Sequence, residues 1–172
     1  NSAFVASVKT ADFENSHPLA GIQFQRILEQ SAFSLGGSNY EAPVQLLGDF
    51  LDKKPSQKAG VVKPSYTGNI EYTDLNRCLP SFIADTLQKS VKYLDNKLKG
   101  FGMKDALLTG VETRTSSPVR MPRNEELESI TIKGLYPAGE GAGYAGGIVS
   151  AGVDGLRVAE RIIQKYAPPA VK

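Results

Sequence analysis

The feature that most constrains the fold is a glycine-dense turn, residues 139–147, near the carboxyl end of the sequence. Leu135 to Ala138 precede it as a candidate strand, and residues 147–166 follow with apolar side chains at helical spacing. A helix that begins at such a turn has N–H groups without intrahelical partners and a partial positive charge at its start. We therefore predict a strand–turn–helix unit whose turn offers hydrogen-bond donors to an anionic or carbonyl-bearing ligand.

Residues 141–146 also match the pattern G-x-G-x-x-G. A dinucleotide-binding fingerprint needs a βαβ unit of ~30 residues with an acidic residue beyond the helix. Here a single helix pattern follows the turn, and Glu160, at about the right distance, lies inside that helix. The turn is therefore not the first unit of a Rossmann domain. Gly152 and Gly155 within the helix each cost ~1 kcal/mol relative to alanine. On the glycines alone, a ligand site and a tight helix–strand crossing without a ligand both remain open.

The rest of the sequence predicts mixed secondary structure. Residues 3–9 have the pattern of a strand, and Pro18 begins a helix that Gly36-Gly37 ends. A shorter helix runs through Val44 to Leu51, and residues 53–76 form a long loop. The clearest helix starts at Leu79-Pro80-Ser81, with an apolar stripe of Ile83, Leu87, Val91, Leu94 and Leu98.

A second set of elements follows the middle helix. Strands are predicted at 106–112, 127–132 and 135–138. The last helix is expected to bury a stripe made of Val149, Val153, Leu156, Ala159, Ile163 and Tyr166. Strands and helices together predict an α+β or α/β class.

Composition excludes several classes of protein. The formal net charge is +2, and the basic residues are scattered among acidic ones, so the sequence predicts no nucleic-acid partner. The apolar runs are shorter than the ~20 residues that span a bilayer, so no membrane segment is expected. The single cysteine, Cys78, fits a reducing compartment. We predict a cytoplasmic protein.

Three further places could carry chemistry. Arg114 and Arg120 bracket Thr115, Ser116 and Ser117, which is typical either of an anion site or of a turn with local hydroxyl caps. His17, the only histidine, could transfer a proton or cap the helix that follows. Cys78 could have a pKa lowered by the next helix, or be a buried inert thiol. No spacing of ligand residues predicts a metal site.

The stretch Gly134-Leu135-Tyr136-Pro137-Ala138-Gly139-Glu140-Gly141-Ala142-Gly143 resembles the C-terminal motif of two-domain FAD oxidoreductases. Its continuation to Ala159 resembles, more specifically, uncharacterised FAD-dependent dehydrogenases of bacteria. Residues 1–8, 17–25, 42–51 and 109–120 also resemble that family, so the likeness covers nearly the whole chain.

The resemblance implies a division of the chain. Residues 9–105 would form a middle, substrate-side domain of strands and helices. Residues 1–8 and 106–172 would supply the last strands and the terminal helix of an FAD-binding domain. The N-terminal dinucleotide-binding part of such an enzyme is absent from the sequence, so we expect a C-terminal fragment. Its expected partners are that missing domain of the same polypeptide and a small-molecule substrate.

The resemblance also implies site residues. FAD is the expected cofactor, contacted by Gly139, Glu140, Gly146, Gly147 and Ile148. Glu140 would bind hydroxyls of the ribityl chain or near the pyrophosphate, and the N–H groups of Gly147 and Ile148 would face the pyrimidine carbonyl of the flavin. Candidates to face substrate or flavin are Arg114, Thr115, Ser116 and Arg120.

The sequence assigns neither a substrate nor a catalytic residue. Two other functions stay open: a non-catalytic anion- or nucleotide-binding module that uses the turn at 139–147, and a plain interaction domain. If the turn normally packs against FAD and a further domain, the chain would expose an apolar patch there and could dimerise.

Overall fold

The computed structural model describes residues 2–166, which form two compact units. The first unit combines the residues up to Phe13 with Gln23–Thr113, and the second combines Glu14–Ile22 with the residues from Arg114 onwards. The assignment of residues 9–105 to a middle domain, and of residues 1–8 and 106–172 to an FAD-binding domain, stays a prediction.

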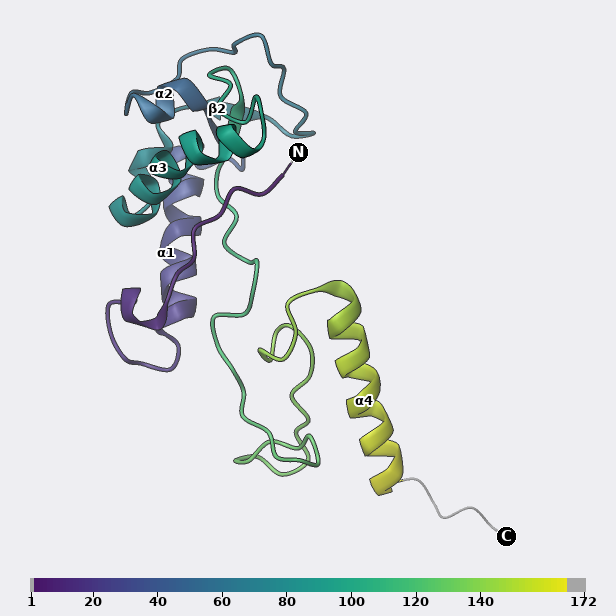
Figure 1. The fold of residues 1–172 in the computed structure, drawn as a ribbon. Coiled ribbons are helices and arrows are strands. Elements are labelled where there is room, and N and C mark those ends of the chain that lie inside the picture. Colours follow the sequence, from purple (N-terminus) through teal and green to yellow (C-terminus); the bar gives the residue numbers. More distant parts are fainter. Residues whose placement is uncertain (1, 167–172) are drawn as a thin grey trace. The chain divides into compact units, whose positions relative to one another are not determined.

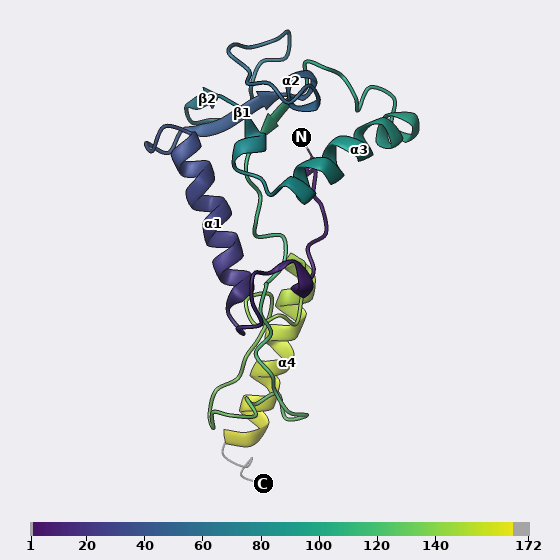
Figure 2. The same ribbon diagram turned by 90° about the vertical axis from the view of Figure 1, so that its left-hand side faces the viewer.

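A small mixed sheet organises the first unit. Its strands are β1 (Ala42–Leu46), β2 (Ile70–Tyr72) and β3 (Leu107–Thr109), in the order β2-β1-β3. β1 pairs in parallel with β2 and antiparallel with β3, so that Val44 lies opposite both Tyr72 and Thr109. β1 leads directly into the short helix α2 (Leu47–Leu51), as Figure 2 shows.

Helices α1 (Ala20–Leu35) and α3 (Ser81–Lys97) complete the unit, with short 3-10 turns η1 (Thr10–Asp12) and η2 (Leu75–Arg77). α3 turns its spaced apolar residues inward and buries Ile83, Leu87 and Val91. These side chains join one core with residues of α1, α2 and η2. The buried residues of this core are Ala32, Leu47, Phe50, Leu75, Cys78, Ile83, Ala84, Leu87 and Val91.

A buried glutamine fixes the loops around the sheet. Gln45 is completely buried on β1. Its amide nitrogen donates to the carbonyl of Lys54 (2.8 Å) and to the carboxylate of Asp74 (3.2 Å). Its side-chain oxygen accepts the N–H of Leu75 (2.8 Å). Because buried polar backbone groups are costly when unpaired, this one side chain holds two loop segments against the strand.

The second unit is built around α4 (Ile148–Tyr166). An irregular chain from residue 114 to 147 runs beside the helix (Figure 1), with one isolated bridge between Arg123 and Ser129. Lys165 near the end of α4 forms an ion pair of 2.7 Å with Glu128, and Glu128 also accepts the N–H of Gly134. None of the helices in the described part of the chain is long and apolar enough to cross a membrane.

The predicted α+β class is confirmed, and so are the three long helices and a strand within 106–112. The predicted strand at 3–9 is wrong: the segment is extended, and Phe4, Ala6 and Val8 pack on the core, but no strand of the described chain pairs with it. Alternating apolar residues can therefore pack on a core from an extended coil, so the alternation alone does not identify a strand.

Other expectations for short segments are also wrong. Residues 42–46 form the strand β1 and not the start of a helix, and β2 lies inside the expected loop 53–76. Residues 127–132 and 135–138 are not strands. Leu127 (φ 61°) and Gly134 (φ 82°) lie in the left-handed region, so the chain turns where a strand would have to continue.

The largest correction concerns the face of α4. The stripe expected to be buried is exposed, to 78% at Val149, 67% at Leu156 and 61% at Ile163. The buried residues of α4 are instead Asp154 and Val158. The apolar periodicity is real, but within residues 2–166 nothing covers it, because a polar contact through Asp154 sets the inward face.

Candidate functional site

Two glycines of the turn are required by its backbone. Gly139 (φ 67°) and Gly143 (φ 82°) lie in the left-handed region that favours glycine. Two hydrogen bonds close the turn: the N–H of Gly143 donates to the carbonyl of Glu140 (2.9 Å), and the N–H of Tyr144 donates to that of Gly139 (3.0 Å). A Cβ atom at Gly143 would lie 2.6 Å from the carbonyl oxygen of Val119, so this position also needs the space.

The segment 116–121 runs against the same turn. The N–H of Met121 donates to the carbonyl of Ala142 (3.1 Å), and the hydroxyl of Ser117 donates to that of Gly141 (3.2 Å). The Ser116 hydroxyl lies 3.8 Å from where a Cβ atom at Gly146 would stand. The structure therefore brings together two groups of residues that the sequence singled out separately.

Tyr144 joins this segment to the turn. Its hydroxyl donates to the carbonyl of Met121 and accepts the N–H of Arg123, both at 3.1 Å. The guanidinium groups of Arg120 and Arg123 lie 4.3 Å and 3.7 Å from the centre of its ring. These are cation–π distances, so the ring is held by both cations as well as by its hydroxyl.

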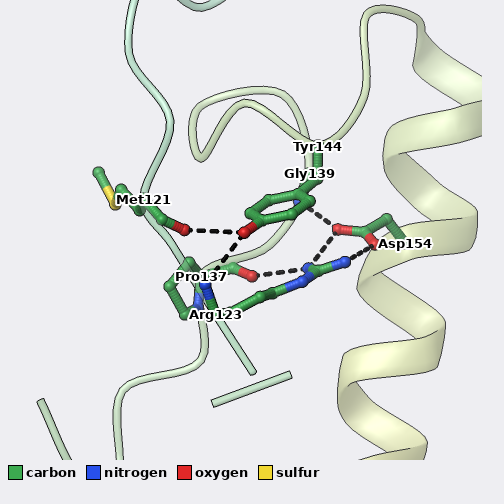
Figure 3. A network of polar contacts seen from close by, with 6 residues as sticks. All are labelled: Met121, Arg123, Pro137, Gly139, Tyr144 and Asp154. Carbon is green, nitrogen blue, oxygen red and sulfur yellow. Dashed lines mark hydrogen bonds and ion pairs between the residues drawn. The ribbon is translucent and has the colours of Figure 1, made fainter. Parts of the chain in front are cut away.

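A buried ion pair connects Arg123, two residues after this segment, to α4 (Figure 3). Arg123 binds Asp154 through both ends of its guanidinium, at 2.6 Å (Nη2 to Oδ1) and 2.9 Å (Nη1 to Oδ2). The two side chains are only 10% and 11% exposed. Nη1 also donates to the carbonyl of Pro137 (2.8 Å), and Asp154 Oδ2 accepts the N–H of Gly139 (2.8 Å).

These contacts decide the charge state of the pair. The hydrogen bonds from Arg123 and, to a smaller extent, from the N–H of Gly139 lower the pKa of Asp154 to about 2, although burial acts in the opposite direction. The hydrogen bond to Asp154 likewise raises the pKa of Arg123. Both groups are therefore charged at neutral pH, and each compensates the burial of the other.

An open groove of ≈ 770 Å³ lies at the start of α4. It is lined by residues of the turn and of the first turns of the helix, among them Tyr144, Gly147, Ile148, Ser150, Val153 and Arg157. Ile148 is 94% exposed, and the first N–H groups of a helix have no intrahelical partner. Asp154 also lines the groove, but Arg123 compensates its charge. With the positive end of the helix dipole and Arg157, this groove therefore suits a ligand that carries negative charge or carbonyl oxygens.

Several glycines have no packing role within residues 2–166. A Cβ atom at Gly141, Gly152 or Gly155 would meet nothing within 4 Å. A tight helix–strand crossing, which was one explanation for glycines in α4, is therefore not found in the described part of the chain. The small residues leave room on surfaces that the chain itself does not fill.

The remaining candidates lie as follows. Arg114 and Thr115 are exposed, and Glu140 is half-buried next to Gly139. His17 is exposed, and its ring Nδ1 accepts the N–H of Leu19 (3.1 Å) just before α1, which supports the capping role. Cys78 is buried, and this burial raises the pKa of its thiol to about 11, so the expected lowering by the next helix is not found; that the thiol is inert stays a prediction. No group of three metal-binding side chains gathers among residues 2–166.

The sequence reasoning missed Arg123, Tyr144 and Asp154 as a group. One signal was available: Asp154 is a carboxylate between Gly152 and Gly155, amid the apolar residues of an amphipathic helix. A charged residue at such a place calls for a buried partner. Nothing in the spacing identifies Arg123, which lies 31 residues earlier, as that partner.

Comparison with known proteins places the chain in a family and beside a longer relative. The family model described as "FAD-dependent protein, C-terminal domain-like" matches residues 1–115. An uncharacterized protein of Clostridium beijerinckii is 54% identical over 169 residues, which are 98% of this chain and 32% of that protein. The chain thus spans about a third of the length of the curated relative it matches. The family match ends just before the segment that packs on the turn, whereas the match to the relative includes the turn.

Proposed function

Because this chain belongs to the family described as FAD-dependent protein, C-terminal domain-like, we propose that it supplies the flavin-side cofactor contacts and the substrate-facing domain of an FAD-dependent oxidoreductase, specifically a dehydrogenase. One observation carries the proposal for the second unit. The hydroxyl- and arginine-bearing segment 116–121 packs on the glycine turn directly beside the groove at the start of α4.

The donor set of this region fits a flavin. Gly146 and Gly147 are exposed and carry no side chain, so a planar ring system could approach the backbone there. In the proposal, the N–H groups of Gly147 and Ile148 bind the pyrimidine carbonyl, and the positive end of α4 favours electron density at that end of the ring. When bound, FAD supplies the redox chemistry, while these residues bind and orient it.

The other candidate residues take roles around that position. Gly139 shapes the chain at the entry to the turn, and Glu140 accepts hydrogen bonds from hydroxyls of the ribityl chain or near the pyrophosphate. Arg120 and Ser116, which lie against the turn, face the flavin or the substrate, as do the exposed Arg114 and Thr115. Guanidinium and hydroxyl groups of this kind would bind a carboxylate or another anionic group of the substrate.

We propose that the exposed face of α4 binds the remainder of an FAD-binding domain that lies elsewhere in the same polypeptide. On α4, the side chains of Val149, Leu156 and Ile163 are each more than half exposed. Soluble proteins rarely leave such a continuous apolar surface uncovered. The relative is about three times as long as this chain and so has ample sequence for such a domain.

A visible absorption spectrum tests the proposal. The 172-residue chain and the longest natural polypeptide that carries it are purified, with and without added FAD. We expect the longer polypeptide to be yellow with flavin absorption, and the shorter chain to take up little FAD, because in the proposal a domain outside these 172 residues binds the adenine half. If the longer polypeptide takes up no FAD, the proposal is wrong, and a non-catalytic anion- or nucleotide-binding module or a plain interaction domain becomes the better description.

Glu140→Ala in the longer polypeptide tests the site itself. Loss of a charge-assisted hydrogen bond to a hydroxyl should cost about 1.5–3 kcal/mol of binding, which corresponds to at least roughly tenfold weaker FAD affinity. Glu125→Ala is the matched control, since Glu125 is an exposed acid of the same unit outside the turn. Equal FAD affinity of the two variants would remove Glu140 from the site.

A further inference from the structure

The carboxylate of Asp154 binds two different groups at once. Its Oδ2 accepts the guanidinium of Arg123 (2.9 Å) and also the buried backbone N–H of Gly139 (2.8 Å), while Oδ1 takes the second arm of the guanidinium (2.6 Å). The side chain comes from the second turn of α4, and Gly139 begins the glycine turn (Figure 3). One carboxylate thus fixes the position of the turn relative to the helix that follows it.

Arg123 holds the same turn at other points. Its Nη1 donates to the carbonyl of Pro137 (2.8 Å), just before the turn, and its backbone N–H donates to the hydroxyl of Tyr144 (3.1 Å), inside it. Its guanidinium lies over the Tyr144 ring. Pro137, Gly139 and Tyr144 are therefore all held by one pair of buried, oppositely charged side chains.

We infer that Arg123 and Asp154 are positioning residues for the cofactor site: they hold the backbone of residues 137–144 so that the exposed N–H groups at the start of α4 are presented in one fixed arrangement. This inference rests on the proposed function, because it assigns the pair to the same flavin site. Preorganised donors bind a ligand more tightly than donors that must first be ordered, since the ordering entropy is then not lost on binding.

The chemistry of the pair separates this role from that of a simple ion pair. The N–H of Gly139 needs an acceptor at residue 154, and an arginine cannot provide one. Asp154→Asn keeps an acceptor oxygen but loses the charge, and Asp154→Ala loses both. Reversing the pair, with Arg123→Asp and Asp154→Arg together, restores opposite charges but leaves the N–H of Gly139 without its acceptor.

Amide hydrogen exchange measures the effect on the turn in the 172-residue chain. We expect exchange at Gly139 to be roughly tenfold or more faster in Asp154→Ala, less so in Asp154→Asn, and not restored by the reversed pair. Lys165→Gln is the matched control, because it removes another ion pair of α4 that does not touch the turn. Exchange in the last turns of α4, which lie in the same unit but away from the turn, reports whether the second unit of each variant remains folded.

The flavin readout uses the longest natural polypeptide that carries the chain, with FAD as the probe. The visible spectrum, the reduction potential of the bound flavin and the FAD dissociation constant are compared among wild type, Asp154→Ala, the reversed pair and Lys165→Gln. In Asp154→Ala and in the reversed pair, we expect at least roughly tenfold weaker FAD binding and a shifted flavin spectrum and reduction potential. We expect none of these changes in Lys165→Gln.

The outcomes are distinguishable. If wild type takes up no FAD, the proposed function fails, and the assignment of the pair to a flavin site fails with it. If wild type binds FAD but Asp154→Ala matches Lys165→Gln in affinity, spectrum and potential, the positioning role is overturned while the proposed function stands. Restoration of Gly139 protection by the reversed pair would also overturn it, since charge alone would then suffice.

Discussion

Acid should weaken the second unit through one carboxylate, Asp154. Its pKa is lowered from the ordinary 3.8 to about 2, chiefly by Arg123, so the folded unit binds the proton less readily than the unfolded chain does. For a group whose pKa is depressed by folding, the stabilisation is fully present above the unfolded pKa and is lost as pH falls towards the folded one. The relevant window therefore runs from about 4 down to about 2.

The size of the effect follows from the two pKa values. A tenfold change in proton affinity is worth about 1.4 kcal/mol, so the difference between 3.8 and about 2 corresponds to roughly 2–3 kcal/mol of stability above pH 4. The side chain is only 11% exposed, which leaves little solvent screening of the interaction. By linkage, roughly 1 kcal/mol of this contribution should be lost at about pH 3.

The assay must report on the second unit alone. In ¹⁵N-labelled chain, urea unfolding is followed through the amide resonances of Gly139 and Gly143, at about pH 6 and about pH 3. Wild type is compared with Asp154→Asn, which has no carboxylate to titrate. The comparison is necessary because Glu128, whose pKa is also lowered, by Lys165 and the N–H of Gly134, titrates in both proteins.

We expect the stability advantage of wild type over Asp154→Asn to shrink by roughly 1 kcal/mol between the two pH values. In wild type the Gly139 amide shift should also titrate with a midpoint near 2, because that N–H donates to Asp154. A stability difference between wild type and Asp154→Asn that does not change with pH would refute the reasoning, and so would a titration midpoint of the Gly139 amide shift near 3.8. Either result would mean that Arg123 does not lower the pKa of Asp154 in the folded chain.

Three further outcomes follow from the packing. Gln45→Leu should destabilise the first unit by roughly 2–4 kcal/mol in urea unfolding, because buried backbone groups lose their partners, whereas the exposed Gln57→Leu should be neutral. Cys78 should react with a thiol reagent at about pH 8 only after unfolding, since burial raises its pKa to about 11; rapid reaction of the folded chain would contradict this. Gly143→Ala should loosen the turn in amide exchange, whereas Gly141→Ala, which has open space, should not.

The parts of the fold that the sequence predicts are those with long, regular patterns. Ile83, Leu87 and Val91 repeat at helical spacing over α3, and each repeat adds evidence for one face of one helix. β1 fails this test because Ala42–Leu46 is only five residues long and its central residues are all buried, so no alternation distinguishes it from a helix. Its identity is decided by pairing with β2 and β3, which lie 28 or more residues away in the register Ala42↔Ile70.

The candidate site also has a part that the sequence predicts and a part that it does not. The turn itself could be predicted, because glycines at 139 and 143 meet a local backbone requirement that is visible in sequence. The contact between Ser116 and Gly146, and the pairing of Arg123 with Asp154, are long-range facts. They depend on how an irregular chain is laid against a helix, and no periodicity encodes that path.

The wrong face of α4 has the same origin, and it ties the two proposals together. Successive residues of a helix are rotated by about 100°, so Asp154 and Val158 share a face while Leu156 points to the opposite one. Once Arg123 and the N–H of Gly139 draw Asp154 inward, the apolar stripe through Val149 and Leu156 must face outward. The contact that orders the glycine turn is therefore also the contact that presents an apolar surface for a further domain, so disruption of the Arg123–Asp154 pair should weaken the cofactor site and the domain interface together.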